Sequence, residues 1–184
     1  FHAFPLEPAL ADPRVVQAIE AQGLHPFFEL VEHPKIYLKK YVPGILDGKA
    51  NPRLLVIRFG GIGDDLWTFP ALKALKAQYP TLHIGYTVAA KDREVLMGVP
   101  YVDEILVTDR PTVAQADTFD AILDFYESVE NNRDQKIYNP IDICCDWAGV
   151  APTDRLPDWT VAPHEREWAE GWLARQGMTP TDQL

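Results

Sequence analysis

The chain has few cysteines and no long hydrophobic run. Only two of its 184 residues are cysteines, and these two, Cys144 and Cys145, are adjacent. Adjacent cysteines match neither a disulfide framework nor the spacing of a zinc site, so we expect two reduced, buried thiols. No apolar run is long enough for a transmembrane helix, and the first residues lack the pattern of a signal peptide. These absences predict a soluble, cytoplasmic protein.

Positive charge is also scarce. Lysine and arginine total 17 against 27 aspartates and glutamates, which gives a formal net charge of −10. Such a charge opposes electrostatic binding to nucleic acid or to an anionic membrane. The content of 47% hydrophobic and 24% charged residues is that of a folded protein, and the length suits one domain with appendages.

The most informative stretch is residues 53–80, RLLVIRFGGIGDDLWTFPALKALKAQYP. Its apolar run at 54–57 is typical of a parallel strand covered on both faces. Three glycines follow, and then an apolar face at helical spacing predicts a helix over 65–79. Strand, glycine loop and helix open a Rossmann-like sheet, in which ligands bind where the strands end. Pro70 removes one backbone donor, so we expect a kink or a restart of the helix near Thr68.

The glycine loop lacks the two commonest nucleotide-binding patterns. It has no Gly-Lys-Ser/Thr ending of a Walker loop, and Gly60, Gly61 and Gly63 fail the dinucleotide spacing Gly-x-Gly-x-x-Gly. The next predicted strand ends without an acid to hold a ribose. Asp64 and Asp65 would repel a phosphate at this loop. A carboxylate at a helix N-terminus can instead accept a proton or cap the helix.

Beyond the first 52 residues, strand patterns alternate with helical patterns. We expect strands over 53–58, 82–88, 102–107 and 120–125, and helices over 65–79, 91–97, 112–117, 134–148 and 163–176. The alternation predicts an α/β fold with a Rossmann-like parallel sheet. Pro163 and Gly177 mark the start and the end of the last helix.

Residues 1–52 are predicted to form an N-terminal extension. A helix is expected over 12–23, where Asp and Pro begin it and Gly ends it. An extended segment follows over 35–42, and turn residues over 43–52 place a boundary before the first strand. We expect this extension to pack against the domain or to dock a partner, and not to be catalytic.

One family resembles this sequence from residue 53 to residue 184. The run that carries the resemblance is Gly63-Asp64-x-x-x-x-x-Pro70-Ala71-Leu72-x-Ala74-Leu75, which is similar to the start of the heptosyltransferases, the ADP-heptose:lipopolysaccharide transferases of glycosyltransferase family nine. Later segments fit in the same order. Residues 101–105 resemble the family's VDEVI strand, 119–124 resemble its YDVVIDLQG strand, and 151–157 with 163–169 resemble its lead-in to a second domain.

The resemblance implies a GT-B architecture of two Rossmann-like halves, the first holding the acceptor and the second the nucleotide sugar. This chain would be a single half, with an extension over 1–52, an acceptor-side domain over 53–162 and a connecting helix over 163–184 that leads toward an absent donor-binding domain. The implied chemistry is inverting transfer from a nucleotide-sugar donor to a glycan or lipopolysaccharide-type acceptor. It implies no metal and no cofactor, since the donor, an ADP-sugar, is a substrate.

The resemblance also implies a location and a limit on activity. The enzymes it points to act in lipopolysaccharide biosynthesis, in the cytoplasm or peripherally at the inner membrane. Because the donor half is missing, we do not expect this chain to be active alone. A missing C-terminal domain, or a partner protein, is expected on its open face.

By position, Asp64 matches the family's proposed general base, which takes the proton of the acceptor hydroxyl. Its alternative role is to cap the helix. Arg58 and Asp124 lie at the ends of predicted strands, and Lys91 follows the predicted strand over 82–88. All three are predicted to bind substrate at the same rim. The alternatives are a surface salt bridge for Arg58 and a solvated helix start for Lys91.

The three loop glycines, Gly60, Gly61 and Gly63, are predicted to let a substrate lie close to the backbone. Their alternative role is a tight turn alone.

Some positions depart from the family pattern. Asp65 replaces an apolar residue, Trp67 replaces a common His, and Phe-Tyr-Glu at 125–127 replaces Leu-Gln-Gly. Because Asp64 and Asp65 are adjacent, we expect one of the two carboxylates to be merely solvated. Repulsion between the like charges should also raise the pKa of one of them. Acids also outnumber bases from Arg110 onward, which fits poorly with a heavily phosphorylated acceptor.

Two alternatives therefore stay open. In the first, the chain is a non-catalytic remnant that serves as a protein-binding or structural subunit. In the second, it is a different nucleotide-binding α/β protein.

Overall fold

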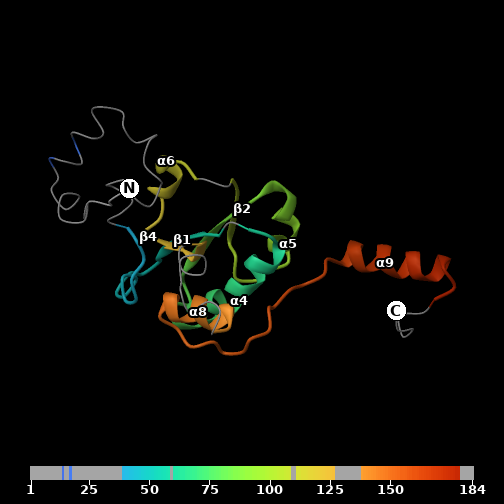
Figure 1. Cartoon of the computed structure of the whole chain (residues 1–184). Coiled ribbons are helices and arrows are strands. Elements are labelled where there is room, and N and C mark those ends of the chain that lie inside the picture. The colour runs from blue at the N-terminus through green and yellow to red at the C-terminus, as the bar shows by residue number, and fades with distance from the viewer. Residues whose placement is uncertain are drawn as a thin grey trace.

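The computed structural model describes Arg14, Gln17 and residues 39–58, 60–108, 111–126 and 138–178 (Figure 1). Its centre is a sheet of four parallel strands in the order β3-β2-β1-β4. The strands are β1 (Arg53–Ile57), β2 (His83–Val88), β3 (Glu104–Val107) and β4 (Ala121–Asp124). The predicted α/β fold with a Rossmann-like parallel sheet is therefore confirmed for this part of the chain.

The helices lie close to their predicted positions. They are α4 (Ile62–Gln78), the 3-10 helix η3 (Ala90–Asp92), α5 (Arg93–Met97), α6 (Val113–Ala116), α8 (Pro140–Ala148) and α9 (Pro163–Arg175). The first residues of the predicted helix over 134–148 lie outside the described residues. So do nearly all of the predicted helix over 12–23 and residues 35–38 of the extended segment.

Helix α4 continues through Pro70. Of the two outcomes expected near Thr68, the restart is therefore wrong, and the kink stays a prediction. A proline inside a helix costs about 3 kcal/mol. The helix offsets this cost because it buries Phe69, Leu72 and Leu75 completely against the sheet, and each such side chain contributes about 1.5–3 kcal/mol. Tertiary packing thus decides the conformation at this proline.

Hydrophobic clusters hold helices on both faces of the sheet. Leu54 and Val56 of β1 belong to the larger cluster, which includes residues of α4 and α8. Leu55 and Ile57 point the other way, into a smaller cluster with Ala116 of α6. This alternation is the two-residue period of a strand buried on both faces.

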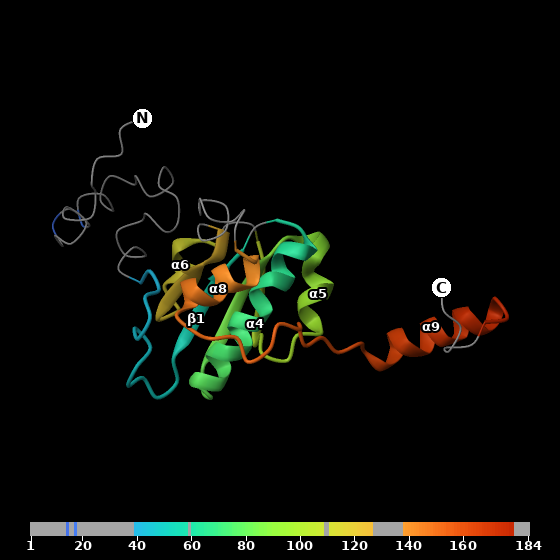
Figure 2. The ribbon, with the colours of Figure 1, turned by 60° about the horizontal axis from the view of Figure 1, so that its bottom comes forward.

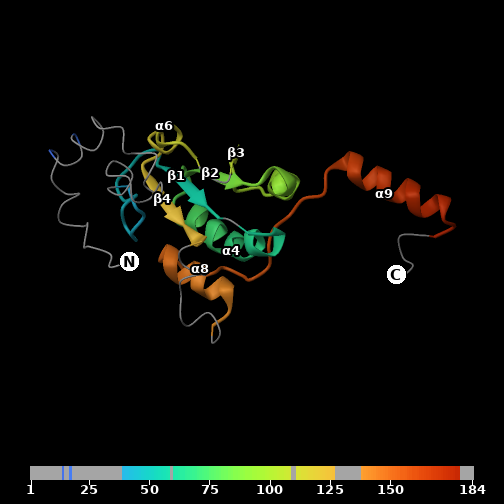
Figure 3. The same ribbon diagram turned by 45° about the horizontal axis from the view of Figure 1, so that its top comes forward.

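The order of the strands reverses between β1 and β4. The connection from β1 to β2 runs through α4, and the connection from β3 to β4 runs through α6, on the opposite face of the sheet (Figure 3). In open α/β sheets, ligands bind beside the carboxyl ends of the strands at such a reversal. The fold therefore directs attention to the loops that follow β1 and β4.

Residues 39–49, which the sequence assigns to the N-terminal extension, pack against the domain. The N–H of Tyr41 donates to the carbonyl oxygen of Ile122 at 2.7 Å, which extends the parallel pairing beyond β4. The Tyr41 hydroxyl donates to the carbonyl oxygen of Ala148 at 2.8 Å, and Leu46 is only 1% exposed. This segment contributes to the core of the domain.

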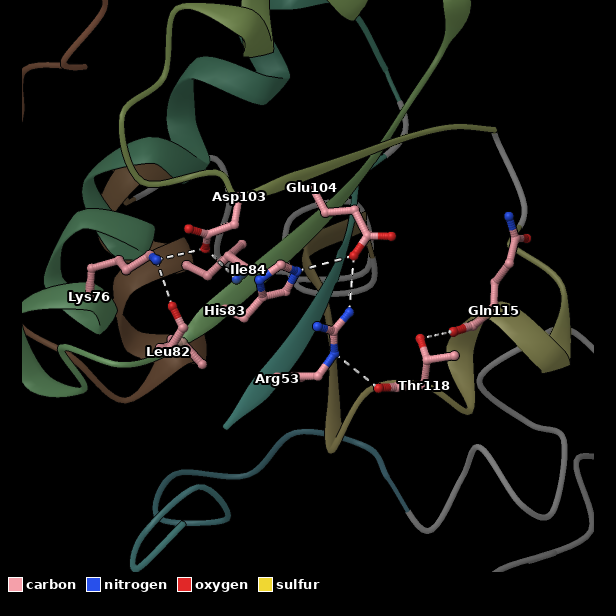
Figure 4. A network of polar contacts seen from close by, with 9 residues as sticks. All are labelled: Arg53, Lys76, Leu82, His83, Ile84, Asp103, Glu104, Gln115 and Thr118. Atoms are coloured by element: carbon pink, nitrogen blue, oxygen red, sulfur yellow. Dashed lines mark hydrogen bonds and ion pairs between the residues drawn. The ribbon is translucent and has the colours of Figure 1, made fainter. Parts of the chain in front are cut away.

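Polar side chains join the amino ends of the strands (Figure 4). Glu104 of β3 accepts a hydrogen bond from Arg53 Nη2 of β1 at 3.0 Å, and its Oε2 lies 3.1 Å from His83 Nε2 of β2. Lys76 of α4 donates to Asp103 at 2.6 Å. These contacts fix the end of the sheet that lies opposite the loops after β1 and β4.

The linker, residues 150–162, follows the domain surface before α9 projects away from it (Figures 1 and 2). Trp159 Nε1 donates to a carbonyl oxygen of α5 at 2.7 Å. The N–H of Thr160 donates to the carbonyl oxygen of Gly98 at 2.8 Å. No residue of α9 is buried, and Trp168 is among its exposed side chains.

Both cysteines are free and buried in α8, as predicted. Burial raises the pKa of the Cys144 thiol to about 12, which keeps the sulfur uncharged at neutral pH. Among the described residues, no helix has both the length and the apolar character needed to cross a bilayer.

The packing of residues 39–49 gives a stability prediction. Leu46→Ala should lower the free energy of unfolding by about 2–5 kcal/mol, because it leaves a cavity in the core. The matched control is Val42→Ala, four residues earlier and 55% exposed, which should stay within about 0.5 kcal/mol of wild type. Urea denaturation followed by circular dichroism measures both. Equal effects of the two substitutions would contradict the assignment of this segment to the core.

Candidate functional site

The candidate site lies at the carboxyl ends of β1 and β4. Arg58 follows β1 directly, and the glycine loop then leads into α4, whose first turn carries Asp64. On the other side of the strand reversal, Asp124 ends β4 and Tyr126 follows it. The fold thus brings together residues that are about sixty positions apart in the sequence.

Asp64 is held through both of its carboxylate oxygens. Oδ1 accepts a hydrogen bond from Arg58 Nη2 at 2.7 Å, and Oδ2 accepts one from the backbone N–H of Gly61 at 2.7 Å. The second contact caps the amino end of α4, so the capping role is present. The side chain is still 26% exposed, and each oxygen can accept more than one hydrogen bond. Its role as a base stays a prediction.

Arg58 forms a buried ion pair and not the surface salt bridge that the sequence left as its alternative. Its side chain is fully buried, and its guanidinium carbon lies 5.9 Å from the centre of the Tyr126 ring. The charge is directed at Asp64. Removing one member of a buried ion pair costs about 3–5 kcal/mol, so this contact fixes the loop between them. Its predicted contact with a substrate remains a prediction.

The three loop glycines differ in their backbone conformation and in the space available for a side chain. Gly60 has a φ of 143°, and a Cβ on it would collide with Asp64 Oδ2. A Cβ on Gly61 would lie at an ordinary 3.8 Å from that oxygen, and a Cβ on Gly63 would meet nothing. Only Gly60 is required to be glycine. The group that lies close to the loop in this structure is the Asp64 carboxylate.

Asp65 follows Asp64 in α4 and is only 4% exposed, so it is not a merely solvated carboxylate. Its Oδ1 accepts a hydrogen bond from the Tyr86 hydroxyl at 3.0 Å, and that hydroxyl lies 3.1 Å from Thr68 Oγ1. Burial raises the pKa of Asp65 to about 6, and the charge of Asp92 adds to this while the Tyr86 hydrogen bond opposes it. The raised pKa expected of one of the two carboxylates is therefore found at Asp65.

Lys91 and Asp124 lie on opposite sides of β1. Lys91 is on η3 after β2, is 71% exposed, and its Nζ is 3.5 Å from Asp92 Oδ2. Asp124 accepts a hydrogen bond from the backbone N–H of Tyr126 at 2.9 Å. A ligand centred between β1 and β4 would meet Asp124 before Lys91. Both remain predicted substrate-binding residues.

The sequence indicated Tyr126 only as part of a departure from the family pattern, without a role, and did not single out Tyr86. Tyr86 shares the two-residue period of Ile84 and Val88, which only indicates that it faces α4. No short-range pattern joins Tyr126 to Arg58, because that contact crosses the sheet. Within the described ranges, no three His, Cys, Asp or Glu side chains are grouped so that they could hold a metal ion.

The loop geometry predicts that alanine at Gly60 and alanine at Gly63 change the stability of the protein in different directions. Gly60→Ala should destabilise the protein by about 1–3 kcal/mol, because its φ is unfavourable for alanine and its Cβ meets Asp64. Gly63→Ala, three residues later in the first turn of α4, should be neutral or stabilising by up to about 1 kcal/mol. Thermal unfolding of the two variants measures the difference. A Gly60→Ala protein as stable as Gly63→Ala would show that the loop has another conformation.

Asp65 gives a pH prediction. Its pKa of about 6 lies above the ordinary 3.8, so the folded protein binds this proton more tightly than the unfolded chain does. The ionised carboxyl therefore lowers stability above pH 6, by about 3 kcal/mol, and this cost disappears as the pH falls below about 4. Asp65→Asn should stabilise the protein relative to wild type at pH 7.5 much more than at pH 4. Urea denaturation across this range tests the prediction, and a difference that is constant with pH would contradict it.

Comparisons with known proteins place the fold. No family model matches the chain, and no curated protein matches it. Among solved structures, the glycosyl transferase family 9 protein from Veillonella parvula DSM 2008 aligns with a TM-score of 0.55 and 19% identity, covering 71% of this chain and 51% of that chain. The E. coli ADP-heptose lps heptosyltransferase II aligns at 0.46 and 13% identity, covering 70% of this chain and 51% of that one.

A third solved structure is E. coli heptosyltransferase WaaC with ADP, at a TM-score of 0.36 and 15% identity, covering 71% of this chain and 49% of that one. This chain thus spans about half the length of the proteins it matches. The alignment to the Veillonella structure confirms the resemblance at the level of the fold. The chain has an α/β fold like that of about half of this glycosyl transferase family 9 structure.

Proposed function

We propose that this chain is the acceptor-side half of a heptosyltransferase-like, inverting glycosyltransferase. An acceptor hydroxyl oxygen attacks the anomeric carbon of a nucleotide sugar and forms the new C–O bond. The bond from that carbon to the nucleotide diphosphate breaks, and the diphosphate leaves with the electron pair. Asp64 takes the proton of the hydroxyl as general base. The donor half lies outside these 184 residues.

The position of Asp64 is the observation that carries this proposal. The carboxylate lies at the strand reversal, where this type of sheet binds ligands. Arg58 and the N–H of Gly61 fix both oxygens at 2.7 Å, and the side chain keeps partial exposure. A base must be oriented toward the proton that it removes, and such a group contributes about 10²–10⁴-fold in rate. The ion pair supplies the orientation.

The other predicted residues have supporting roles in this proposal. Gly60 allows the carboxylate to approach the loop, and Arg58 acts as a positioning residue for Asp64. Gly61 and Asp124 lie closest to an acceptor held between β1 and β4. Lys91, across β1, would face the far side of the ligand. An ADP-sugar as donor, a lipopolysaccharide-type acceptor and a cytoplasmic or peripheral inner-membrane location follow from the sequence resemblance alone.

The alternative is a non-catalytic, protein-binding remnant of the same fold. The observation that favours it is that Asp64 already caps α4 and neutralises Arg58, which together explain an aspartate here without any catalysis. The exposed Trp168 of α9 adds an aromatic surface outside the domain. The two functions differ in whether Asp64 is needed for sugar transfer.

Sugar transfer by Asp64→Asn tests the proposal. The protein is purified from its native source, so that any partner or further polypeptide is present, and transfer from an ADP-sugar to a glycan is measured. We expect Asp64→Asn to lower kcat by about 10²–10⁴-fold. Asp65→Asn is the matched control, since its carboxyl is buried, and it should retain most of the activity. Thermal unfolding checks that both variants are folded.

Full activity in Asp64→Asn, or an equal loss in Asp65→Asn, would contradict the base role. Absence of transfer by the wild-type protein, with a partner protein retained on purification, would establish the non-catalytic alternative.

A further inference from the structure

We infer that the site takes an uncharged saccharide as its acceptor and that the sugar ring stacks on Tyr126. This inference rests on the proposed function and names the substrate class of the same site. It depends on the aromatic ring after β4 and on the arrangement of charge around Asp64.

Tyr126 is placed to form one wall of the site. It lies two residues beyond the end of β4, and its backbone N–H donates to Asp124 Oδ1 at 2.9 Å, which fixes the turn. Its ring lies over Arg58, at 5.9 Å from the guanidinium carbon, and Arg58 in turn holds Asp64. The residue nevertheless remains 43% exposed. The ring and the candidate base thus share one buried neighbour.

An exposed tyrosine offers what a sugar ring binds. The face of a pyranose carries C–H groups that pack on an aromatic ring, and its hydroxyls remain at the edge to form hydrogen bonds. Exposed Ile62 adds apolar surface two residues before Asp64. The family pattern that this chain resembles has Leu-Gln-Gly where Phe-Tyr-Glu stands here. A glutamine amide would contact a sugar through hydrogen bonds, whereas Tyr126 contacts it through a ring.

The charges at the strand reversal do not suit a phosphorylated acceptor. The Arg58 guanidinium is fully buried and is paired with Asp64. The pair is therefore close to neutral, and Asp124, at the end of the neighbouring strand, would repel a phosphate.

The cations of the described rim lie on the other side of β1. Lys91 faces Asp92, and Arg93 Nη1 donates to the sulfur of Met97 at 3.2 Å. Both follow β2, which pairs with the edge of β1 that faces away from β4. A phosphate bound by these residues would draw the acceptor away from Tyr126. The two substrate classes therefore predict different binding residues.

Binding to a glycan array tests the inference without requiring sugar transfer. The array holds a set of neutral saccharides and the phosphate monoester of each one. We expect the wild-type protein to bind neutral members more tightly than their phosphate monoesters. Tyr126→Ala should weaken this binding by about fivefold to tenfold, the scale of one stacked aromatic contact. Tyr126→Phe should stay within about twofold of wild type, because the ring remains.

Two controls separate this inference from the proposed function. Trp168→Ala removes an exposed aromatic ring from α9, far from the site (Figure 1), and should leave binding unchanged. Asp64→Asn should still bind neutral saccharides even if it transfers no sugar. Tighter binding of the phosphate monoesters that is lost in Lys91→Ala would overturn the inference while leaving Asp64 as the base. Equal binding by Tyr126→Ala and wild type, or no binding by the wild type, would also overturn it.

Discussion

The buried ion pair between Arg58 and Asp64 is the contact on which the candidate site depends. A guanidinium enclosed by protein requires a nearby negative charge, because an unpaired buried charge is far more costly than a paired one. Asp64 meets that need at 2.7 Å, and its second oxygen caps α4. Gly60 then has to be glycine, because the carboxylate occupies the space of its side chain. The end of β1, the glycine loop and the first turn of α4 therefore depend on one another for their conformation.

Asp65, the second carboxylate, differs from Asp64 because its burial is not compensated by a paired cation in the described contacts. Asp65 is buried without a cation at hydrogen-bond distance in the described contacts, and its partner is the Tyr86 hydroxyl. Its ionised form lowers the stability of the fold at neutral pH, and the apolar packing of α4 on the sheet outweighs that cost. The two adjacent acids thus lie in different environments. One faces the rim with a fixed orientation, and the other lies between helix and sheet.

Much of the fold follows from local patterns in the sequence. The apolar run at 54–57 and the alternation after it locate the strands, because burial on both faces leaves a signal along the chain itself. The candidate base is located by the Gly63-Asp64 element. The features that local patterns did not indicate involve tertiary contacts. The continuity of α4 at Pro70 and the burial of Asp65 and Arg58 each depend on the residues that another element places beside them, and the spacing along the chain does not record those contacts.

The linker has a consequence for how α9 can move. The backbone N–H of Thr160 donates a hydrogen bond to the carbonyl oxygen of Gly98, whereas no residue of α9 itself is buried. Within the described residues no side chain of α9 is buried, so the direction of the helix depends largely on the backbone torsions of Val161 and Ala162. A change in these torsions would redirect α9 without altering the contacts that hold Asp64 at the strand reversal.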